Sequence, residues 1–549
     1  MTRTRTIGTP FCPSVILSIL FCVAPSTAQV PVELTIDGGA TVAENSYAYY
    51  TATALFDDGQ EFEVTLFCDW SVEPDTYASI DRFARLTTEQ VPKDQEIVVG
   101  ASFVWDEIQV EDAMGVTIID VPPDEGADPW PFWGRTTTRI ANTATVGPQT
   151  PTIDWSVLIS TFAFENINEA SPVMDAHGRI FQGTIDGMTG VDSVAREVLW
   201  METDGDVTRG TAVWGGRVVW GDFSPFSTLY CHDAATGQEL WTFQAPTAFS
   251  QTAPVVDPNG VVYIPDALGA MYARRMEDGS EVWTTEIGAE AFDAPSLDWP
   301  LLLTSCGGFV NLVGIDPLTG VIEWTFGTES LIQGTSVHFD NRVYVGSNDR
   351  YLYCIDAETG VEIWRFWCEQ SNRGSVGVGH DDTVYTATSG NEGILFAVSS
   401  DGEELWRYYA EGLVFNAPIV SGDGTIYFCS QLAPDLGWVH AVRSDGTELW
   451  TREMTQQVTA SPMLAPDGTL YVVSRDKFLY AFRDPVGDLD FDGDIDLDDF
   501  AKFEECLTGP RLWGEAAKTT PGCELLDFDS DWDVDFTDFA QFQLAFTGP

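Results

Sequence analysis

Twelve aspartates near the C-terminus form two groups with the spacing of twelve-residue calcium loops. The first group fills loop positions 1, 3, 5, 7, 9 and 12 with Asp488, Asp490, Asp492, Asp494, Asp496 and Asp499. The second group begins 39 residues later and comprises Asp527, Asp529, Asp531, Asp533, Asp535 and Asp538. Carboxylate, backbone carbonyl and water oxygens at these positions are the usual ligands of Ca²⁺. The sequence therefore predicts two calcium sites within residues 486–549.

The residues around each group bear on whether this segment is a folded module or a disordered acidic tail. So many carboxylates within a dozen residues repel one another unless a hard cation neutralises them. Each group leads into an amphipathic helical pattern, formed by Phe500, Phe503 and Leu507 after the first and by Phe539, Phe542 and Phe546 after the second. Gly493 allows the sharp turn of the first loop, whereas Trp532 replaces it in the second. We therefore expect two loop–helix units, the second with the weaker site.

This segment resembles type I dockerins, in which two calcium loops each precede a helix and aspartate stands at loop position 12. The resemblance implies a small α-helical calcium-binding module that docks onto a cohesin-like protein. Loop positions 10 and 11 are Leu-Asp and Phe-Thr here, where that family usually has Ser-Thr, so a cohesin partner stays open. Cys506 and Cys523 bracket the spacer between the two halves. A disulfide between them would staple a module too small for a large core.

A tryptophan that follows a turn recurs every 40 to 45 residues in the middle of the chain. Its copies, such as DAETGVEIW, end at Trp155, Trp200, Trp241, Trp283, Trp324, Trp364, Trp406 and Trp450. Between them a second motif, such as APVVDPNGVVYI from Ala253, occurs eight times and has the pattern of two strands joined by a turn. With a third strand and the tryptophan strand, each period holds four strands, which is the content of one propeller blade.

These repeats predict an eight-bladed β-propeller over residues 132–485. The eighth copy has no tryptophan strand of its own, and Trp155 lies in a strand that precedes the first copy. If that early strand completes the last blade, the ring closes without a free edge. We expect each repeat tryptophan to pack as an apolar plate against the next sheet. We expect each repeat glycine to permit a positive φ in its turn.

The repeats resemble the PQQ-like repeat family of propellers, which holds quinone-dependent dehydrogenases, outer-membrane assembly scaffolds and other secreted proteins. For the dehydrogenases, the resemblance implies a vicinal disulfide over the quinone, calcium ligands and an aspartate base. The sequence has no adjacent cysteine pair, which argues against a PQQ cofactor, and we assign no catalytic residue. Cys231 and Cys354 occupy equivalent repeat positions, where small buried residues fit. The five histidines lie singly on different repeats and fit turn or strand positions better than a ligand set.

Residues 29–120 contain short alternating strands and predict a β-sandwich. The run TATALFDDG, with Trp70 followed by SVEPD, resembles bacterial Ig-like domains of group 2. The resemblance implies a spacer or adhesion module with Trp70 in its core. Residues 121–131 are rich in Pro, Asp and Gly and are predicted to be a linker. The fold class is therefore all-β, with an Ig-like domain, a propeller and a small helical tail.

Residues 1–28 have the pattern of a signal peptide, with Arg3 and Arg5 before an apolar stretch and a small-x-small site at Ser26-Thr27-Ala28. We therefore expect a secreted or cell-surface protein without a transmembrane segment. The net charge of −59 excludes nucleic acid as a natural partner, because binding to phosphates depends on Lys and Arg. The acidic balance fits solubility in a salty medium and, in the tail, cation binding.

The sequence thus predicts a secreted, non-catalytic binding or scaffold protein. The propeller would be the interaction surface, and the dockerin-like tail would attach it to a protein partner when calcium is bound. Two enzymatic alternatives stay open. One is an extracellular carbohydrate-active enzyme that hydrolyses O-glycosidic bonds of a polysaccharide with paired carboxylates. The other is a PQQ-dependent dehydrogenase.

Overall fold

The computed structural model describes residues 30–484 except for gaps at 39–40, 44–46, 75–77, 81–83, 89–94, 106–107, 120–140, 144, 161–169, 186, 204–206, 208–209, 223–227, 250–251, 289–293, 299–300, 308–311, 391–392 and 433–434. The predicted signal peptide, linker and calcium module lie outside the described residues. The chain divides into two compact units, Met1–Gly126 and Ala127–Pro549. The division falls within the predicted linker, and each unit is described by itself.

The N-terminal unit consists of two sheets. In the first, strands run in the order β1 (Pro31–Gly38), β3 (Tyr47–Phe56), β7 (Arg85–Thr88), β6 (Ala78–Ile80), and β4 (Glu61–Glu63) pairs with β3. In the second, the order is β2 (Thr41–Ala43), β9 (Ile108–Ile119), β8 (Gln95–Trp105), β5 (Cys68–Glu73). The short 3₁₀ helix η1 (Thr65–Phe67) leads into β5. Strands that follow one another in the sequence thus often belong to different sheets.

The two N-terminal sheets share one apolar core. Tyr50 and Phe56 of β3 pack with Ile97 and Val99 of β8, and all four side chains are buried. Trp70 lies against this core but is only partly buried, and its indole N–H donates to the Thr65 carbonyl at 3.0 Å. The described residues of this unit thus form two sheets that share one core. The Ig-like β-sandwich domain stays a prediction.

Eight four-stranded sheets lie in the described part of the second unit, and we number them 1 to 8 along the chain. Sheets 1 to 4 are β11 (Val173–Met174), β12 (Arg179–Thr184), β13 (Gly187–Asp192), β14 (Glu197–Glu202); β15 (Thr211–Trp214), β16 (Arg217–Gly221), β17 (Thr228–Asp233), β18 (Glu239–Gln244); β19 (Val255–Val256), β20 (Val261–Pro265), β21 (Ala270–Arg275), β22 (Glu281–Glu286); and β23 (Ser296–Asp298), β24 (Leu301–Ser305), β25 (Leu312–Ile315), β26 (Ile322–Phe326).

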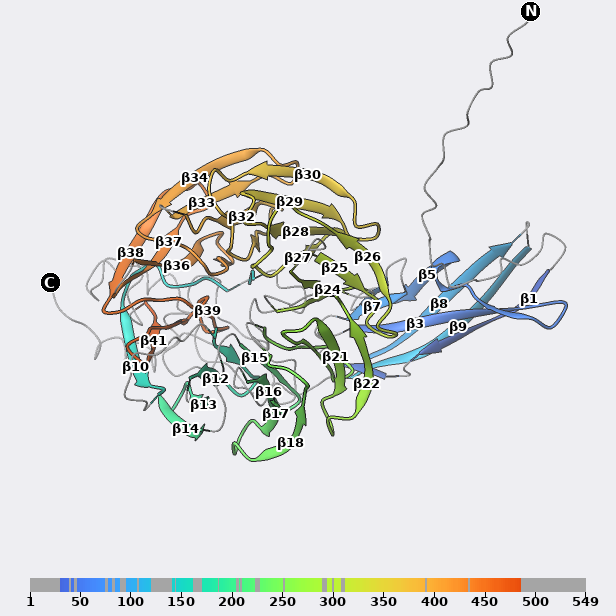
Figure 1. The fold of residues 1–549 in the computed structure, drawn as a ribbon. Coiled ribbons are helices and arrows are strands. Elements are labelled where there is room, and N and C mark those ends of the chain that lie inside the picture. The colour runs from blue at the N-terminus through green and yellow to red at the C-terminus, as the bar shows by residue number, and fades with distance from the viewer. Residues whose placement is uncertain are drawn as a thin grey trace, which may run out of the picture. The chain divides into compact units, whose positions relative to one another are not determined.

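Sheets 5 to 8 repeat the same antiparallel order. They are β27 (Val337–Phe339), β28 (Arg342–Gly346), β29 (Tyr351–Asp356), β30 (Glu362–Trp367); β31 (Gly377–Val378), β32 (Val384–Ala387), β33 (Gly393–Val398), β34 (Glu404–Ala410); β35 (Ile419–Val420), β36 (Ile426–Leu432), β37 (Leu436–Val442), β38 (Glu448–Met454); and β39 (Met463–Leu464), β40 (Leu470–Val473), β41 (Phe478–Phe482), β10 (Ile153–Leu158). Figure 1 shows these sheets arranged around a common centre, each with its last strand at the rim. The all-β class and the propeller-like arrangement predicted from the repeats are confirmed.

Position within a sheet explains the residue pattern of each strand. The third strand of sheet 6, β33, is buried along its whole length, because neighbouring sheets cover both of its faces. The outer strand of sheet 5, β30, alternates between exposed and half-buried residues, because one face meets solvent. The sequence accordingly has continuous apolar runs in inner strands and alternation in tryptophan strands.

The last sheet is completed by a strand from the beginning of the second unit, as the sequence predicts. β10 pairs antiparallel with β41, so that Trp155 lies opposite Ala481. On the inner side, the Ser461 N–H of sheet 8 donates to the Ser171 hydroxyl of sheet 1 at 3.0 Å. Asp154 and Arg196 form an ion pair between the same two sheets at 2.9 Å. Sheets 8 and 1 are therefore joined from the centre to the rim.

The described residues before β10, 141–143 and 145–152, lie against sheets 6, 7 and 8, and we call them the strap. Asn142 forms a parallel bridge with Val420 and donates to the Val378 carbonyl at 3.0 Å. The Pro148 carbonyl accepts from the Trp450 indole N–H and the Tyr427 hydroxyl at 2.9 and 3.0 Å. The Asp484 carboxylate accepts the N–H groups of Gln149 and Thr150, each at 2.8 Å. These bonds connect positions about three hundred residues apart in the sequence.

The repeat tryptophans dock each sheet onto the next one. In sheet 4 the Trp324 indole N–H donates to the Ala357 carbonyl of sheet 5 at 2.9 Å, and the bond recurs from Trp200, Trp241, Trp283, Trp364 and Trp406. Gly360 of sheet 5 lies directly on the Trp324 ring, where a Cβ would approach ring carbons to 2.7 Å. The predicted packing against the next sheet is confirmed for these six tryptophans. The glycine is needed for this close approach as well as for its φ of +67°.

Gly360→Ala should destabilise the propeller by about 2–4 kcal/mol, because the left-handed backbone and the indole contact both oppose a methyl group. Gly216→Ala is the matched control. Its φ is +74°, but no atom lies within 4 Å of a Cβ at that position, so it carries the backbone cost alone. Urea unfolding monitored by tryptophan fluorescence measures both. Equal losses of stability in the two variants would show that the glycine–indole contact contributes nothing.

Candidate functional site

The predicted calcium ligands and the predicted cysteine pair lie outside the described residues. This applies to all twelve aspartates from Asp488 to Asp538 and to Cys506 and Cys523. Between residues 30 and 484, the described His, Cys, Asp and Glu side chains form no group of three or more that could hold a metal ion. The calcium sites and the disulfide therefore stay predictions.

Aspartates at the hairpin turns of the propeller hold the turns together. The Asp266 carboxylate accepts the N–H groups of Leu268 and Ala270, each at 2.9 Å, and the Tyr272 hydroxyl at 2.9 Å. The same Asp–Tyr bond occurs at 2.8 Å between Asp349 and Tyr353 and at 2.6 Å between Asp476 and Tyr480. These carboxylates therefore stabilise the turns of the propeller. The sequence analysis missed them, although an Asp four to six residues before a strand Tyr recurs in the repeats.

Three other carboxylates, those of Asp222, Asp257 and Asp484, are also buried. Burial raises the pKa of the Asp257 carboxyl, although the Val261 N–H and the Tyr263 hydroxyl oppose the shift. Burial likewise raises the pKa values of Asp222 and Asp484. Each of these groups accepts backbone N–H bonds at 2.8 Å, at Thr228 for Asp222 and at Thr150 for Asp484. Their hydrogen bonds point to roles in the turns and the strap.

His440 lies in a buried hydrogen-bond chain that crosses sheet 7. Its Nε2 is 2.8 Å from the Ser430 hydroxyl, and its Nδ1 is 3.2 Å from the Thr451 hydroxyl. The Thr451 hydroxyl in turn lies 3.1 Å from the Glu448 carboxylate. Phe428 stacks on the imidazole with ring centroids 4.7 Å apart. Burial lowers the pKa of His440 to about 4, so the ring is neutral at neutral pH.

A serine beside a histidine is also the pair used in nucleophilic catalysis. Ser430 and His440 both have 0 % of their surface exposed, and the Ser430 hydroxyl contacts the Glu411 carbonyl. A nucleophile must be reachable by its substrate. In this conformation the pair acts as a hydrogen-bond link between the two central strands of sheet 7. Of the other histidines, His232 packs on Trp220 with ring centroids 4.5 Å apart, and burial lowers the pKa of His232 as well.

Protein stability should fall as the pH drops from about 6.5 towards 4, because the unfolded His440 binds a proton that the folded ring resists. The full loss from this residue is about 3 kcal/mol. His440→Gln should flatten this part of the profile, whereas His177→Gln, at an exposed turn, should leave it unchanged. Urea unfolding at a series of pH values measures the slopes. A profile for His440→Gln as steep as that of the wild type would contradict the assignment.

Six cysteines of the described residues are buried: Cys68, Cys231, Cys306, Cys354, Cys368 and Cys429. Cys231 and Cys354 have 0 % of their surface exposed, which agrees with the prediction of small buried residues there. Burial raises the pKa of each of these two thiols to about 12. A thiol that stays protonated and inaccessible is a poor nucleophile.

In the mature chain carrying Cys506→Ser and Cys523→Ser, a thiol reagent at pH 8 should therefore find almost no reactive cysteine. After denaturation it should find six. Colorimetric titration with an aromatic disulfide gives both numbers. Rapid labelling of the native protein would show that a strand carrying one of these thiols opens, or that the thiol is exposed.

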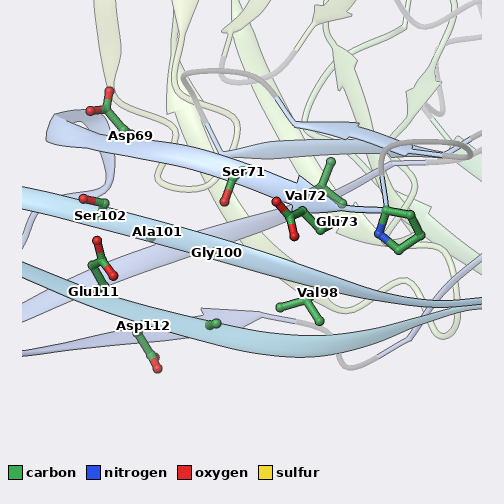
Figure 2. Close-up of a pocket in the computed structure, with 12 residues that line it drawn as sticks. Asp69, Ser71, Val72, Glu73, Val98, Gly100, Ala101, Ser102, Glu111 and Asp112 are labelled. Carbon is green, nitrogen blue, oxygen red and sulfur yellow. The ribbon is translucent and has the colours of Figure 1, made fainter.

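A shallow hollow of about 1070 Å³ lies on the N-terminal unit, over strands β5, β8 and β9 (Figure 2). The base of the hollow is low because the residues there have small side chains or none. Ser71, Gly100 and Ala113 lie opposite one another on the three paired strands. Asp69 and Glu111 border the hollow, and its lining contains no Lys or Arg. The surface is thus acidic and open, with backbone and hydroxyl groups at its base.

Among the described residues, no helix is long and apolar enough to cross a membrane.

Four-stranded antiparallel sheets around a common centre, docked by repeated tryptophans, define a β-propeller of the tryptophan-docked class. Residues 188–298, 225–349, 309–412 and 348–430 match the family model described as outer membrane protein assembly factor BamB. The central repeats are thus similar in sequence to PQQ-like repeat propellers of the BamB type. The match covers the central repeats.

Two curated proteins share parts of the sequence. The outer membrane protein assembly factor BamB of Burkholderia pseudomallei is 34% identical over 84 residues, which is 15% of this chain and 21% of that protein. The quinohemoprotein alcohol dehydrogenase of Comamonas testosteroni is 23% identical over 198 residues, 34% of this chain and 24% of that protein. The chain thus spans about a fifth to a quarter of the length of these relatives.

Solved structures share the fold at low sequence identity. BamB from Moraxella catarrhalis has a TM-score of 0.50 and 18% identity, covering 60% of this chain and 99% of that one. A europium-containing methanol dehydrogenase has a TM-score of 0.53 and 13% identity, covering 64% and 90%. The same fold therefore occurs in an assembly factor and in an oxidoreductase. The fold alone does not distinguish these functions, so the residues of the site must distinguish them.

Proposed function

We propose that this protein is an exported, non-catalytic binding propeller that presents its surface to a protein partner. The observation that carries the proposal is the use of the repeated polar and aromatic side chains. The tryptophans dock sheets, the turn aspartates bind backbone N–H groups and tyrosines, and the buried Ser430–His440 pair links two strands. The likeness to assembly factors of the BamB type adds support.

The parts outside the described residues complete this proposal. Residues 1–28 would direct export, residues 29–120 would form an Ig-like spacer, and residues 486–549 would attach the protein through two calcium-loaded loops. The eight sheets would form the full ring of an eight-bladed propeller, with β10 as the last strand of sheet 8. Acidic loops of this spacing support the calcium proposal, because their repulsion needs a cation to offset it.

The mature chain, residues 29–549, should bind two Ca²⁺ ions, the first more tightly than the second. Asp488→Ala and Asp499→Ala should each weaken the first site by roughly tenfold or more, because each removes a carboxylate ligand. Asp498→Ala is the matched control, since it removes the same charge from loop position 11, which holds no ligand. Isothermal titration calorimetry measures the affinities. Equal affinities in all three variants would contradict the ligand assignment.

Affinity capture tests the whole proposal. The immobilised mature chain is exposed to an extracytoplasmic extract from its own cells, with calcium or with chelator, and the bound proteins are identified. We expect a defined partner whose capture through the tail needs calcium. Dye reduction with alcohols after addition of PQQ would instead establish a dehydrogenase, and release of reducing sugar from polysaccharides would establish a glycoside hydrolase. Either activity would overturn the non-catalytic proposal.

A further inference from the structure

One tryptophan of the described residues departs from the docking pattern. Trp367 has 46% of its surface exposed, whereas the other described tryptophans are buried or half-buried. It stands three residues after the docking tryptophan of sheet 5. Tyr409 stands at the same repeat position of sheet 6 and is 59% exposed. The equivalent positions of the other sheets hold Leu158, Thr203, Gln244, Glu286, Gly327 and Glu453.

A second position separates the same two sheets from the rest. Arg365 and Arg407 directly follow the docking tryptophans of sheets 5 and 6. The residues at this position in the other sheets are Ser156, Met201, Thr242, Thr284, Thr325 and Thr451. Arginine and an exposed aromatic residue thus lie two residues apart, on the same side of both outer strands. β30 and β34 follow each other along the rim of the ring (Figure 1).

The exposed Trp367 ring is held in place by its neighbours. Tyr351 of β29 lies opposite Trp367 and packs against it with ring centroids 5.0 Å apart. Arg365 lies over the Tyr351 ring at 5.1 Å, and Arg350 lies 5.8 Å from the Trp367 ring centroid. Contacts between cations and ring faces orient both partners. The Trp367 and Tyr351 rings are therefore ordered before any ligand arrives, which lowers the entropic cost of binding.

Sheets 5 and 6 are also bridged next to these rings. The Arg407 guanidinium donates to Glu369 of sheet 5 at 2.8 Å and to both carboxylate oxygens of Glu404 at 2.7 and 2.6 Å. It lies 4.9 Å from the centroid of the Phe396 ring. Charged Arg and Glu side chains thus lie beside the exposed aromatic residues Trp367 and Tyr409.

We propose that this surface, formed by Tyr351, Trp367, Tyr409 and their arginines, binds a neutral polysaccharide. A pyranose ring has an apolar C–H face and a rim of hydroxyl groups. Its C–H groups stack on the negative face of an aromatic ring, while the hydroxyls bond to Arg and Glu side chains. Equivalent rings on two neighbouring sheets suit an extended, repeating ligand. The net charge of −59 disfavours an acidic glycan. This ligand goes beyond the proposed protein partner.

The test uses the mature chain and three neutral hexasaccharides, cellohexaose, xylohexaose and mannohexaose. We expect at least one to bind in calorimetry. Trp367→Ala with Tyr409→Ala should weaken it by about tenfold or more, because both stacking faces are lost. Trp367→Phe with Tyr409→Phe keeps both faces and should stay within about threefold. Leu240→Ala, at an exposed apolar residue of β18, should bind as the wild type does.

Absence of binding to all three sugars by the wild-type chain would overturn the polysaccharide proposal. Unchanged affinity in the double alanine variant would overturn it too, provided that urea unfolding shows both proteins folded. The same variants are also tested in the affinity capture of protein partners. If the double alanine variant loses a protein partner but keeps its affinity for sugar, the surface belongs to that partner and the proposal fails. Loss of sugar binding with capture intact supports it and leaves the proposed function standing.

Discussion

The contact between an indole ring and the glycine of the next sheet is the constraint on which the propeller depends. Trp324 under Gly360 shows its parts: the ring fills the space between two sheets, its N–H reaches the Ala357 carbonyl, and the glycine lets the backbone come close. An aromatic plate covers much apolar area in a fixed geometry, so repeating it fixes the angle between successive sheets. Pairs of rings strengthen the arrangement, as Tyr344 lies 5.9 Å from Trp364 within sheet 5. Because the docking tryptophans pack between sheets, their rings are not available to stack on a cofactor.

Where the repeats end, other contacts take over the same role. Sheet 8 borrows β10, and the Trp450 indole N–H finds its carbonyl on Pro148 of the strap. Arg196 stands in a left-handed conformation, with φ of +60°, at the turn where other sheets have glycine, and it is paired with Asp154. The contacts between successive sheets are thus regular through most of the propeller. Where sheet 8 meets sheet 1, other residues make them. A non-glycine residue at such a φ carries backbone strain, and its side chain forms the contact to Asp154 of sheet 8.

Sequence periodicity was sufficient for the sheets because each repeat carries its own strand and turn signals. Trp155 could be assigned to the last sheet because the repeat count left one strand missing. The strap contacts could not be predicted, since the Asn142–Val420 bridge and the Thr150–Asp484 bond join positions far apart without a motif. His440 looked isolated along the chain, yet its partner Ser430 lies on the neighbouring strand of a hairpin. The exposed pair Trp367 and Tyr409 is visible in the sequence only after the sheets have been aligned by their docking tryptophans.

Completion of sheet 8 by β10 has a consequence for the order in which the chain can fold. Residues 153–158 leave the ribosome long before residues 478–482, with which they pair. Contacts of such high sequence separation form slowly, because a long loop must close first. Until then β10 is an unpaired strand and sheet 8 lacks its rim. Sheet 8 therefore cannot be completed before synthesis of the chain is nearly finished.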